Sequence, residues 1–179
     1  GHPMKFCFST GLFYDNQRPW KGFLHGRTRQ HNSLISSPTS LHLEVKLMVN
    51  VTEEIKESLK AAKIAYLATA AKDGTPNVVP IGAFKFMDGE TLLISDQYFS
   101  KTLNNLKSNP KIALSWWAEK GGFQIKADIT IHTDDDIFRQ NVEWVHGIKD
   151  TLKPKSAIVC KITAVYAVRS GPDAGKQIL

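Results

Sequence analysis

The chain has 179 residues, of which 42% are hydrophobic and 22% are charged, and its formal net charge at pH 7 is +6. This length and composition predict a globular protein with one ordinary core. Its longest apolar runs, such as residues 64–71, are far shorter than the ~20 residues that a membrane helix needs, so we expect no membrane span and a cytoplasmic location.

The positive charge is concentrated in the first part of the chain. Residues 1–47 contain six lysines and arginines against two acidic residues, which gives +4, so the rest of the chain carries only +2. A nucleic-acid-binding domain needs clustered cations to neutralise phosphates, and we therefore expect no nucleic-acid partner. The two cysteines and six histidines show no metal-ligand spacing, so no metal is predicted.

Residues 1–47 are predicted to be a poorly structured N-terminal extension. The first three residues, Gly-His-Pro, are typical of a remnant left by cloning, and the apolar residues that follow keep neither a helical nor a strand period. Met48 directly precedes a well-formed helix pattern. We therefore expect Met48 to be the natural start and residues 48–179 to form the folded domain.

The domain is predicted to begin with a short helix and a strand hairpin. Thr52 can cap the helix, whose apolar residues line one face. A β-rich run at 64–70 is followed by a turn with glycine and proline and by a second strand at 77–87. The Asp88-Gly89 turn then leads into a third, largely buried strand at 91–95.

The second half of the domain returns to strands after one more helix. Ser100 can cap this helix, and Pro110 ends the segment. The predicted elements are a helix at 101–108, strands at 111–117 and 123–133, a helix that begins at the aspartates 134–136, and a last strand at 156–168. Six strands, most of them joined by short turns, predict a mainly β fold: a six-stranded antiparallel barrel with peripheral helices.

The junction between the third strand and the second helix is a candidate anion site. The first turn of a helix presents unpaired backbone N–H groups and a partial positive charge. The hydroxyls of Ser100 and Thr102 and the ammonium of Lys101 converge on this turn, where a phosphate would satisfy them all. Cap-plus-lysine sequences are common, however, and the spacing alone favours simple capping.

Residues 77–82 form a second candidate feature. Pro80 lies inside a strand, where it cannot donate to a ladder, and Gly82 leaves space beside the backbone. A flat ligand can lie there and take hydrogen bonds from the backbone. An edge strand or a β-bulge explains the same residues equally well.

The adjacent tryptophans of the fourth predicted strand should point to opposite faces. We expect one of Trp116 and Trp117 in the core and the other on the barrel surface or in a dimer contact. No Ser-His-Asp, Cys-His or paired-carboxylate arrangement is indicated by the sequence.

Taken in order, these motifs resemble the pyridoxamine 5'-phosphate oxidase-like FMN-binding split-barrel superfamily, and especially its small archaeal and bacterial FMN-binding proteins. The likeness extends from about Thr52 to Arg169. It rests on the runs 64–69, 73–76, 88–89, 100–102, 104–110 and 122–127. The resemblance implies a six-stranded split barrel that forms a homodimer, with one flavin mononucleotide (FMN) in each of two grooves at the interface.

The resemblance also assigns candidate site residues by position. Ser100, Lys101 and Thr102 would hold the FMN phosphate, and Asn105 would assist them. The residues expected to border the isoalloxazine ring and the ribityl chain are Val79, Pro80, Ile81, Gly82, Ser95, Asp96 and Gln97. The candidates for completing the site of the other subunit are Trp116, Trp117 and Gln124.

The function implied by the resemblance is that of an FMN-dependent oxidoreductase acting on a small substrate. A non-catalytic electron carrier or flavin store is the alternative, and a deazaflavin or a haem in place of FMN is a third option. Up to Leu179 the chain lacks the Arg- and Pro-containing segment that the true oxidases use around pyridoxal phosphate. We therefore do not expect pyridoxamine phosphate oxidase activity.

Overall fold

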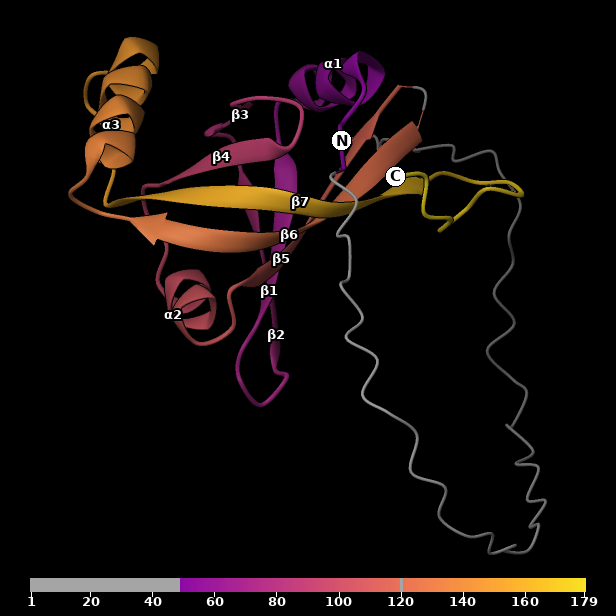
Figure 1. Cartoon of the computed structure of the whole chain (residues 1–179), viewed down its shortest axis with the longest axis horizontal. Helices are drawn as coiled ribbons and strands as arrows, with labels where there is room; N and C mark the ends of the chain where they lie inside the picture. Colours follow the sequence, from indigo (N-terminus) through magenta and orange to yellow (C-terminus); the bar gives the residue numbers. More distant parts are fainter. Residues whose placement is uncertain (1–48, 120) are drawn as a thin grey trace, which may run out of the picture. The chain divides into compact units, whose positions relative to one another are not determined.

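The computed structural model describes residues 49–119 and 121–179, so the predicted N-terminal extension lies outside the described residues (Figure 1). The strands are β1 (Ala65–Ala70), β2 (Pro76–Ile81), β3 (Phe84–Phe86), β4 (Thr91–Asp96), β5 (Lys111–Ala118), β6 (Gly121–His132) and β7 (Ser156–Val168). The helices are α1 (Glu53–Ala62), α2 (Lys101–Ser108) and α3 (Asp136–Ile148). None of these helices has the length and apolarity needed to cross a membrane.

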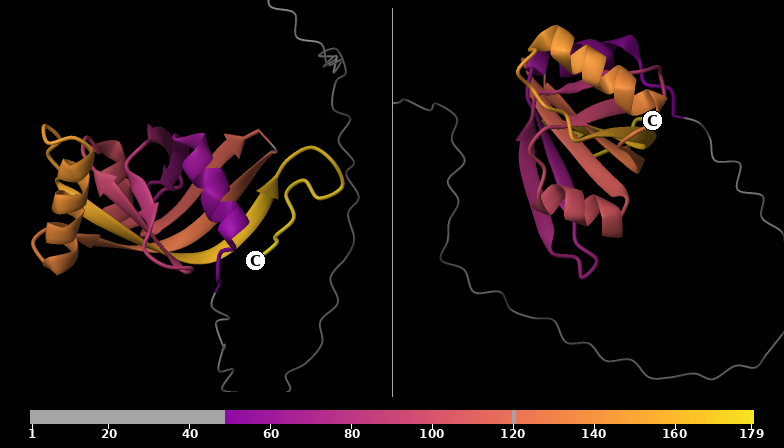
Figure 2. Two further views of the ribbon diagram at one scale, coloured as in Figure 1. Left: turned by 90° about the horizontal axis from the view of Figure 1, so that it is seen from above. Right: turned by 90° about the vertical axis from the view of Figure 1, so that its left-hand side faces the viewer.

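The strands form one antiparallel sheet in the order β2-β1-β5-β6-β7-β4-β3. Its two edge strands, β2 and β3, follow each other in the sequence, so the chain passes from one edge of the sheet to the other at Gly82 and Ala83. The sheet curls, and Figure 2 shows α3 at one end and the β5–β6 hairpin at the other. The mainly β fold expected from the sequence is confirmed.

The predicted number of six strands was wrong, because the run at 77–87 is two strands. Its first half, in β2, pairs with β1, whereas Phe84 to Phe86 pair with β4 at the opposite edge. A glycine in a strand often marks a tight bend at a barrel corner, and Gly82 lies at this bend. A Cβ at Gly82 would lie 3.4 Å from the Ile64 side chain, which is an ordinary van der Waals contact, so the bend and not a lack of space explains the glycine.

The core lies inside the curled sheet and is covered by α1. Ile55 and Leu59 on the inner face of α1 are buried in the same cluster as Trp116. The indole N–H of Trp116 donates to the Ser58 hydroxyl of α1 at 3.1 Å. Trp116 is buried and Trp117 is exposed, which confirms that the two side chains point to opposite faces.

The helix caps agree with the sequence in position and differ in their hydrogen bonds. Thr52 and Ser100 occupy the predicted N-cap positions of α1 and α2, but their side chains make no capping hydrogen bond. At α3, which begins at the predicted aspartates, Asp135 is the cap, and its carboxylate accepts from the Phe138 amide at 3.0 Å. The hydroxyl of Ser100 is therefore available for a different partner at the start of α2.

Candidate functional site

A cavity of about 490 Å³ lies where the chain passes between the two sheet edges. We call it the seam cavity, and its walls come from β2, the Gly82-Ala83 bend, the end of β4, the loop after β4 and the first turn of α2. Its volume is in the range of small-molecule sites. All the predicted cofactor residues line the seam cavity except Asp96 and Asn105.

The residues of the seam cavity that sequence reasoning missed are Asn77, Ala83, Tyr98 and Phe99. Ala83, Tyr98 and Phe99 are adjacent in sequence to residues that were predicted, so contiguity was the available signal. Asn77 belongs to the segment singled out for Pro80 and Gly82, where an amide side chain in a strand was a further signal.

The first turn of α2 forms the polar end of the seam cavity. The first intrahelical hydrogen bond runs from the Asn104 amide to the Ser100 carbonyl at 3.1 Å. The amides of Lys101, Thr102 and Leu103 therefore precede the helical ladder. With the exposed Lys101 side chain and the positive end of the helix dipole, this turn is complementary to an anion such as a phosphate.

A network of side-chain amides and hydroxyls holds this turn against the sheet. The Thr69 hydroxyl of β1 accepts from the Asn77 amide at 3.2 Å and from the Asn105 amide of α2 at 3.1 Å. The Asn77 amide also donates to the Thr102 hydroxyl at 3.1 Å. Because the Thr102 oxygen accepts that bond, its own hydrogen remains for a ligand. Asn105 thus supports the turn from behind and does not line the cavity.

Asp96, which was expected to border the isoalloxazine ring, anchors the loop after β4 instead. This buried carboxylate accepts from the Phe99 amide at 2.8 Å and from the Ser156 hydroxyl at 3.1 Å. The ammonium of Lys155 lies 3.6 Å from it and donates to the Phe99 carbonyl at 2.7 Å. A buried carboxylate needs such partners. They come from the loop after β4, from the first residue of β7 and from the residue before it, and Asp96 itself does not line the seam cavity.

Gln97 brings a buried acceptor without a partner to the seam cavity. Its amide nitrogen donates to the Ser95 hydroxyl at 2.8 Å, while its carbonyl oxygen has no hydrogen-bond partner among the described residues. An unsatisfied buried polar atom costs about 1–3 kcal/mol, so an N–H donor from a ligand would fit here. The seam cavity therefore combines an anion-binding turn, an acceptor, and a largely apolar wall at residues 79–82.

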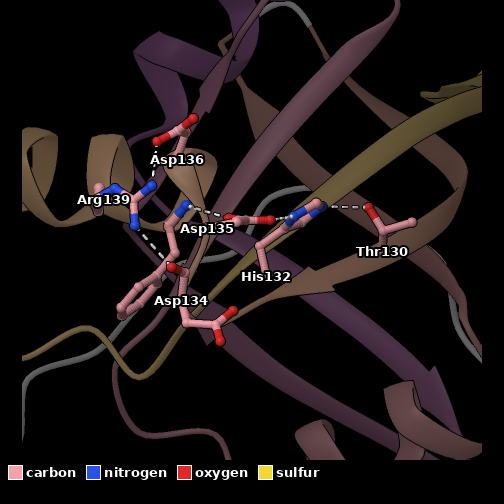
Figure 3. A network of polar contacts seen from close by, with 7 residues as sticks. Thr130, His132, Asp134, Asp135, Asp136 and Arg139 are labelled. Atoms are coloured by element: carbon pink, nitrogen blue, oxygen red, sulfur yellow. Dashed lines mark hydrogen bonds and ion pairs between the residues drawn. The ribbon is translucent and has the colours of Figure 1, made fainter.

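A second polar network lies at the start of α3, where Figure 3 shows His132 between Thr130 and Asp135. One ring nitrogen of His132 is 2.5 Å from the Asp135 carboxylate, and the other is 2.8 Å from the Thr130 hydroxyl. Many hydrolases use a hydroxyl, an imidazole and a carboxylate arranged in this order. The sequence did not indicate that these three residues form such an arrangement. Here the carboxylate is also the cap of α3, and these residues do not line the seam cavity.

This network predicts a pH-dependent contribution to stability. The hydrogen bond to His132, and then the one from the Phe138 amide, hold the pKa of the Asp135 carboxyl below its usual 3.8. A carboxyl with a lowered pKa stabilises the folded state above its unfolded pKa, and this stabilisation is lost as the pH falls through the folded pKa. Asp135→Asn keeps a residue that can cap α3 but removes the charge.

The melting temperature of Asp135→Asn should therefore lie below that of the wild type near neutral pH, and the difference should narrow as the pH falls below the usual pKa of a carboxyl group. Thermal unfolding followed by circular dichroism across this pH range measures the difference. A difference in melting temperature that is the same at every pH would show that the charge of Asp135 does not contribute to stability.

Comparisons with known proteins agree with this fold. The family model described as pyridoxamine 5'-phosphate oxidase matches residues 51–169. The chain is 41% identical to an uncharacterized protein of Methanocaldococcus jannaschii over 134 residues. This match covers 73% of this chain and 89% of that protein. Many solved structures are also similar, among them the following two.

The first is HupZ of Group A Streptococcus, with 22% identity, a TM-score of 0.61, and coverage of 70% of this chain and 99% of that one. The second is an FMN-binding protein of Syntrophomonas wolfei, with 16% identity, a TM-score of 0.59, and coverage of 66% of this chain and 86% of that one. At these identities, the two structural matches show a shared fold.

Proposed function

Because the chain belongs to the pyridoxamine 5'-phosphate oxidase family, we propose that it is a flavoprotein that holds FMN in the seam cavity. The observation that carries this proposal is the convergence of three unlike features on one cavity. They are the anion-binding turn at residues 100–102, the largely apolar wall at 79–82 and the unpartnered acceptor of Gln97. FMN carries a matching feature for each: a phosphate, a flat ring system and a ring N–H.

The phosphate would lie at the first turn of α2. There it would accept hydrogen bonds from the backbone amides, from the hydroxyls of Ser100 and Thr102, and from the Lys101 ammonium. Hydrogen bonds in which one partner is charged, here the phosphate, are roughly twice as strong as those between neutral groups. The Ser100 hydroxyl suits this role because it makes no capping bond.

The isoalloxazine ring would lie against residues 79–82. Among the strands of the described residues, β2 is a sheet edge that pairs with β1 alone, which explains how Pro80 can lie within it without a ladder donor. The Gln97 carbonyl would accept from the ring N–H and so gain its missing partner. FMN supplies hydride and electron transfer when bound, and these residues would orient it and set its hydrogen bonding.

We propose that the bound flavin serves an oxidoreductase that acts on a small substrate. Pro80, Tyr98 and Ser100 are exposed residues of the seam cavity, so a small molecule can approach from this side. Stopped-flow mixing of the FMN-loaded protein with NADH or NADPH tests this activity. Fast, direct reduction of the flavin is expected, whereas reduction only by a protein partner would indicate an electron carrier.

The cofactor itself is tested by absorption spectroscopy. Purified protein that is incubated with FMN and passed over a gel-filtration column should retain the flavin bands. Failure to retain FMN, or a haem or deazaflavin spectrum in the protein as purified, would overturn the FMN assignment.

We also propose that the protein is a homodimer, because the outer face of β1, β2 and β5 carries exposed apolar side chains. Tyr66 is 55% exposed, Val78 62% and Trp117 59%. Tyr66 lies opposite both Pro80 and Ser115, so these strands present the three apolar side chains on one face. Contiguous apolar faces of this kind mark interaction surfaces.

A second copy on this face would reach the edge of the seam cavity, because Pro80 belongs to both. Gln124 lies opposite Ser115 and therefore shares the face with Trp117, so both remain candidates for completing a partner's site. Trp116 is buried in the core of its own subunit, so we do not propose it for this role.

Tyr66→Asp is expected to make the protein monomeric, because it places an unpaired charge within the apolar face. Light scattering coupled to size-exclusion chromatography gives the mass. Met87→Asp is the matched control, since Met87 is an exposed apolar residue just beyond β3, and it should remain dimeric. A monomeric wild type, or a dimeric Tyr66→Asp, would contradict the homodimer.

A further inference from the structure

A second cavity, of about 550 Å³, lies between α1, β3 and α3. We propose that it binds a small aromatic molecule that carries an anionic group such as a phosphate or a carboxylate. Figure 1 shows β3 between the two helices. Gly82 lines both this cavity and the seam cavity, so the two adjoin at the bend between β2 and β3. The inference depends on the residues of the second cavity and does not require that FMN binds.

The walls of this second cavity carry an excess of positive charge. They contain four lysines and two glutamates, which gives +2 from four minus two. Each glutamate is paired with the lysine three residues further along α1, at 2.7 and 3.7 Å. In the described part of the chain, Lys63 and Lys85 have no carboxylate partner, so their ammonium groups are available to an anion.

An aromatic wall faces these ammonium groups. Phe84 and Phe86 of β3 and Trp144 of α3 all line the second cavity. The Lys85 ammonium lies 4.8 Å from the centre of the Trp144 ring, a distance at which a cation and a ring attract each other. A planar ligand could therefore pack against these rings and place its anionic group beside Lys85.

The backbone of Lys63 makes the role of its side chain testable. Lys63 has a φ of 60° and is the one non-glycine residue with positive φ in the described ranges, 49–119 and 121–179. A Cβ is unfavourable in this conformation, which glycine adopts freely. Strained backbone of this kind clusters at binding sites. Lys63 is the C-cap of α1, where a residue of positive φ commonly ends a helix, so glycine at this position would remove the ammonium from the cavity wall without straining the backbone.

Isothermal titration calorimetry with 4-nitrophenyl phosphate tests the site, with FMN-saturated and FMN-free protein. We expect binding in both samples, and much weaker binding of inorganic phosphate, which lacks the ring, and of 4-nitrobenzyl alcohol, which lacks the charge. Lys85→Gln and Lys63→Gly should each weaken binding by about tenfold or more, the factor expected for a lost hydrogen bond to a charged group. Lys72→Gln, in the distant β1–β2 turn, should leave it unchanged.

Lys63→Gly separates a binding role from a structural one. Because glycine suits the φ of 60°, the melting temperature should hold or rise while the affinity for 4-nitrophenyl phosphate falls. Absence of binding, or equally tight binding of inorganic phosphate, would overturn the proposal. Binding that is lost in Lys101→Ala and kept in Lys63→Gly would also overturn it, because the probe would then occupy the seam cavity.

Discussion

Lys101→Ala is expected to weaken FMN binding about tenfold to a hundredfold. Lys101 contributes the one ammonium group that lines the seam cavity within the described part of the chain, and it lies at the helix turn that would hold the phosphate. A hydrogen bond to a charged group contributes roughly 1.5–3 kcal/mol, and about 1.4 kcal/mol corresponds to a tenfold change in Kd. Quenching of FMN fluorescence during a titration gives the Kd.

Lys107→Ala is the matched control for this substitution. Lys107 lies in the last turn of the same helix and does not line the seam cavity, so its loss removes an equal charge without a phosphate contact. Its Kd should remain that of the wild type. The Lys101 side chain is exposed, so Lys101→Ala should also fold with an unchanged melting temperature. An unchanged Kd in Lys101→Ala would place the phosphate elsewhere.

Thr69→Val should lower both the stability of the flavin-free protein and its affinity for FMN. Valine has nearly the same shape but lacks the oxygen that accepts from Asn77 and Asn105. Asn105 is buried, and an unsatisfied buried donor costs about 1–3 kcal/mol. The same bond ties α2 to β1, so its loss should also loosen the turn that would hold the phosphate. Urea unfolding without FMN measures the first effect, and the FMN titration measures the second.

Thr69→Ser separates the hydrogen bonds from the packing of the methyl group. Serine keeps the acceptor oxygen, so this variant should retain most of the FMN affinity and most of the stability that Thr69→Val loses. If Thr69→Ser is as destabilised as Thr69→Val, the methyl group and not the network stabilises this region. Lys101→Ala and Thr69→Val should therefore have different effects. Lys101→Ala should lower the affinity for FMN alone, whereas Thr69→Val should lower both this affinity and the stability of the flavin-free protein.

The sequence alone determined those elements whose signals are local. The helix predicted at 101–108 has the bounds observed for α2, and the strand predicted at 156–168 has those observed for β7. Apolar periodicity and a following proline suffice to define such a segment, because each acts on its immediate neighbours in the chain. The local signals at 79–82 and 100–102 left simpler explanations open, and it was the resemblance to a family that assigned most of the residues lining the seam cavity, which fall in the two runs 79–82 and 95–102.

Only the tertiary structure decided how the run at 77–87 divides, because its halves pair with β1 and β4 at opposite edges of the sheet. It also decided that Asp96 and Asn105 do not line the seam cavity, and it brought them partners from β7 and β1. A buried polar side chain takes its partner from whichever group folding brings within about 3 Å. That group can be far away in the sequence, so neither spacing nor periodicity reveals it.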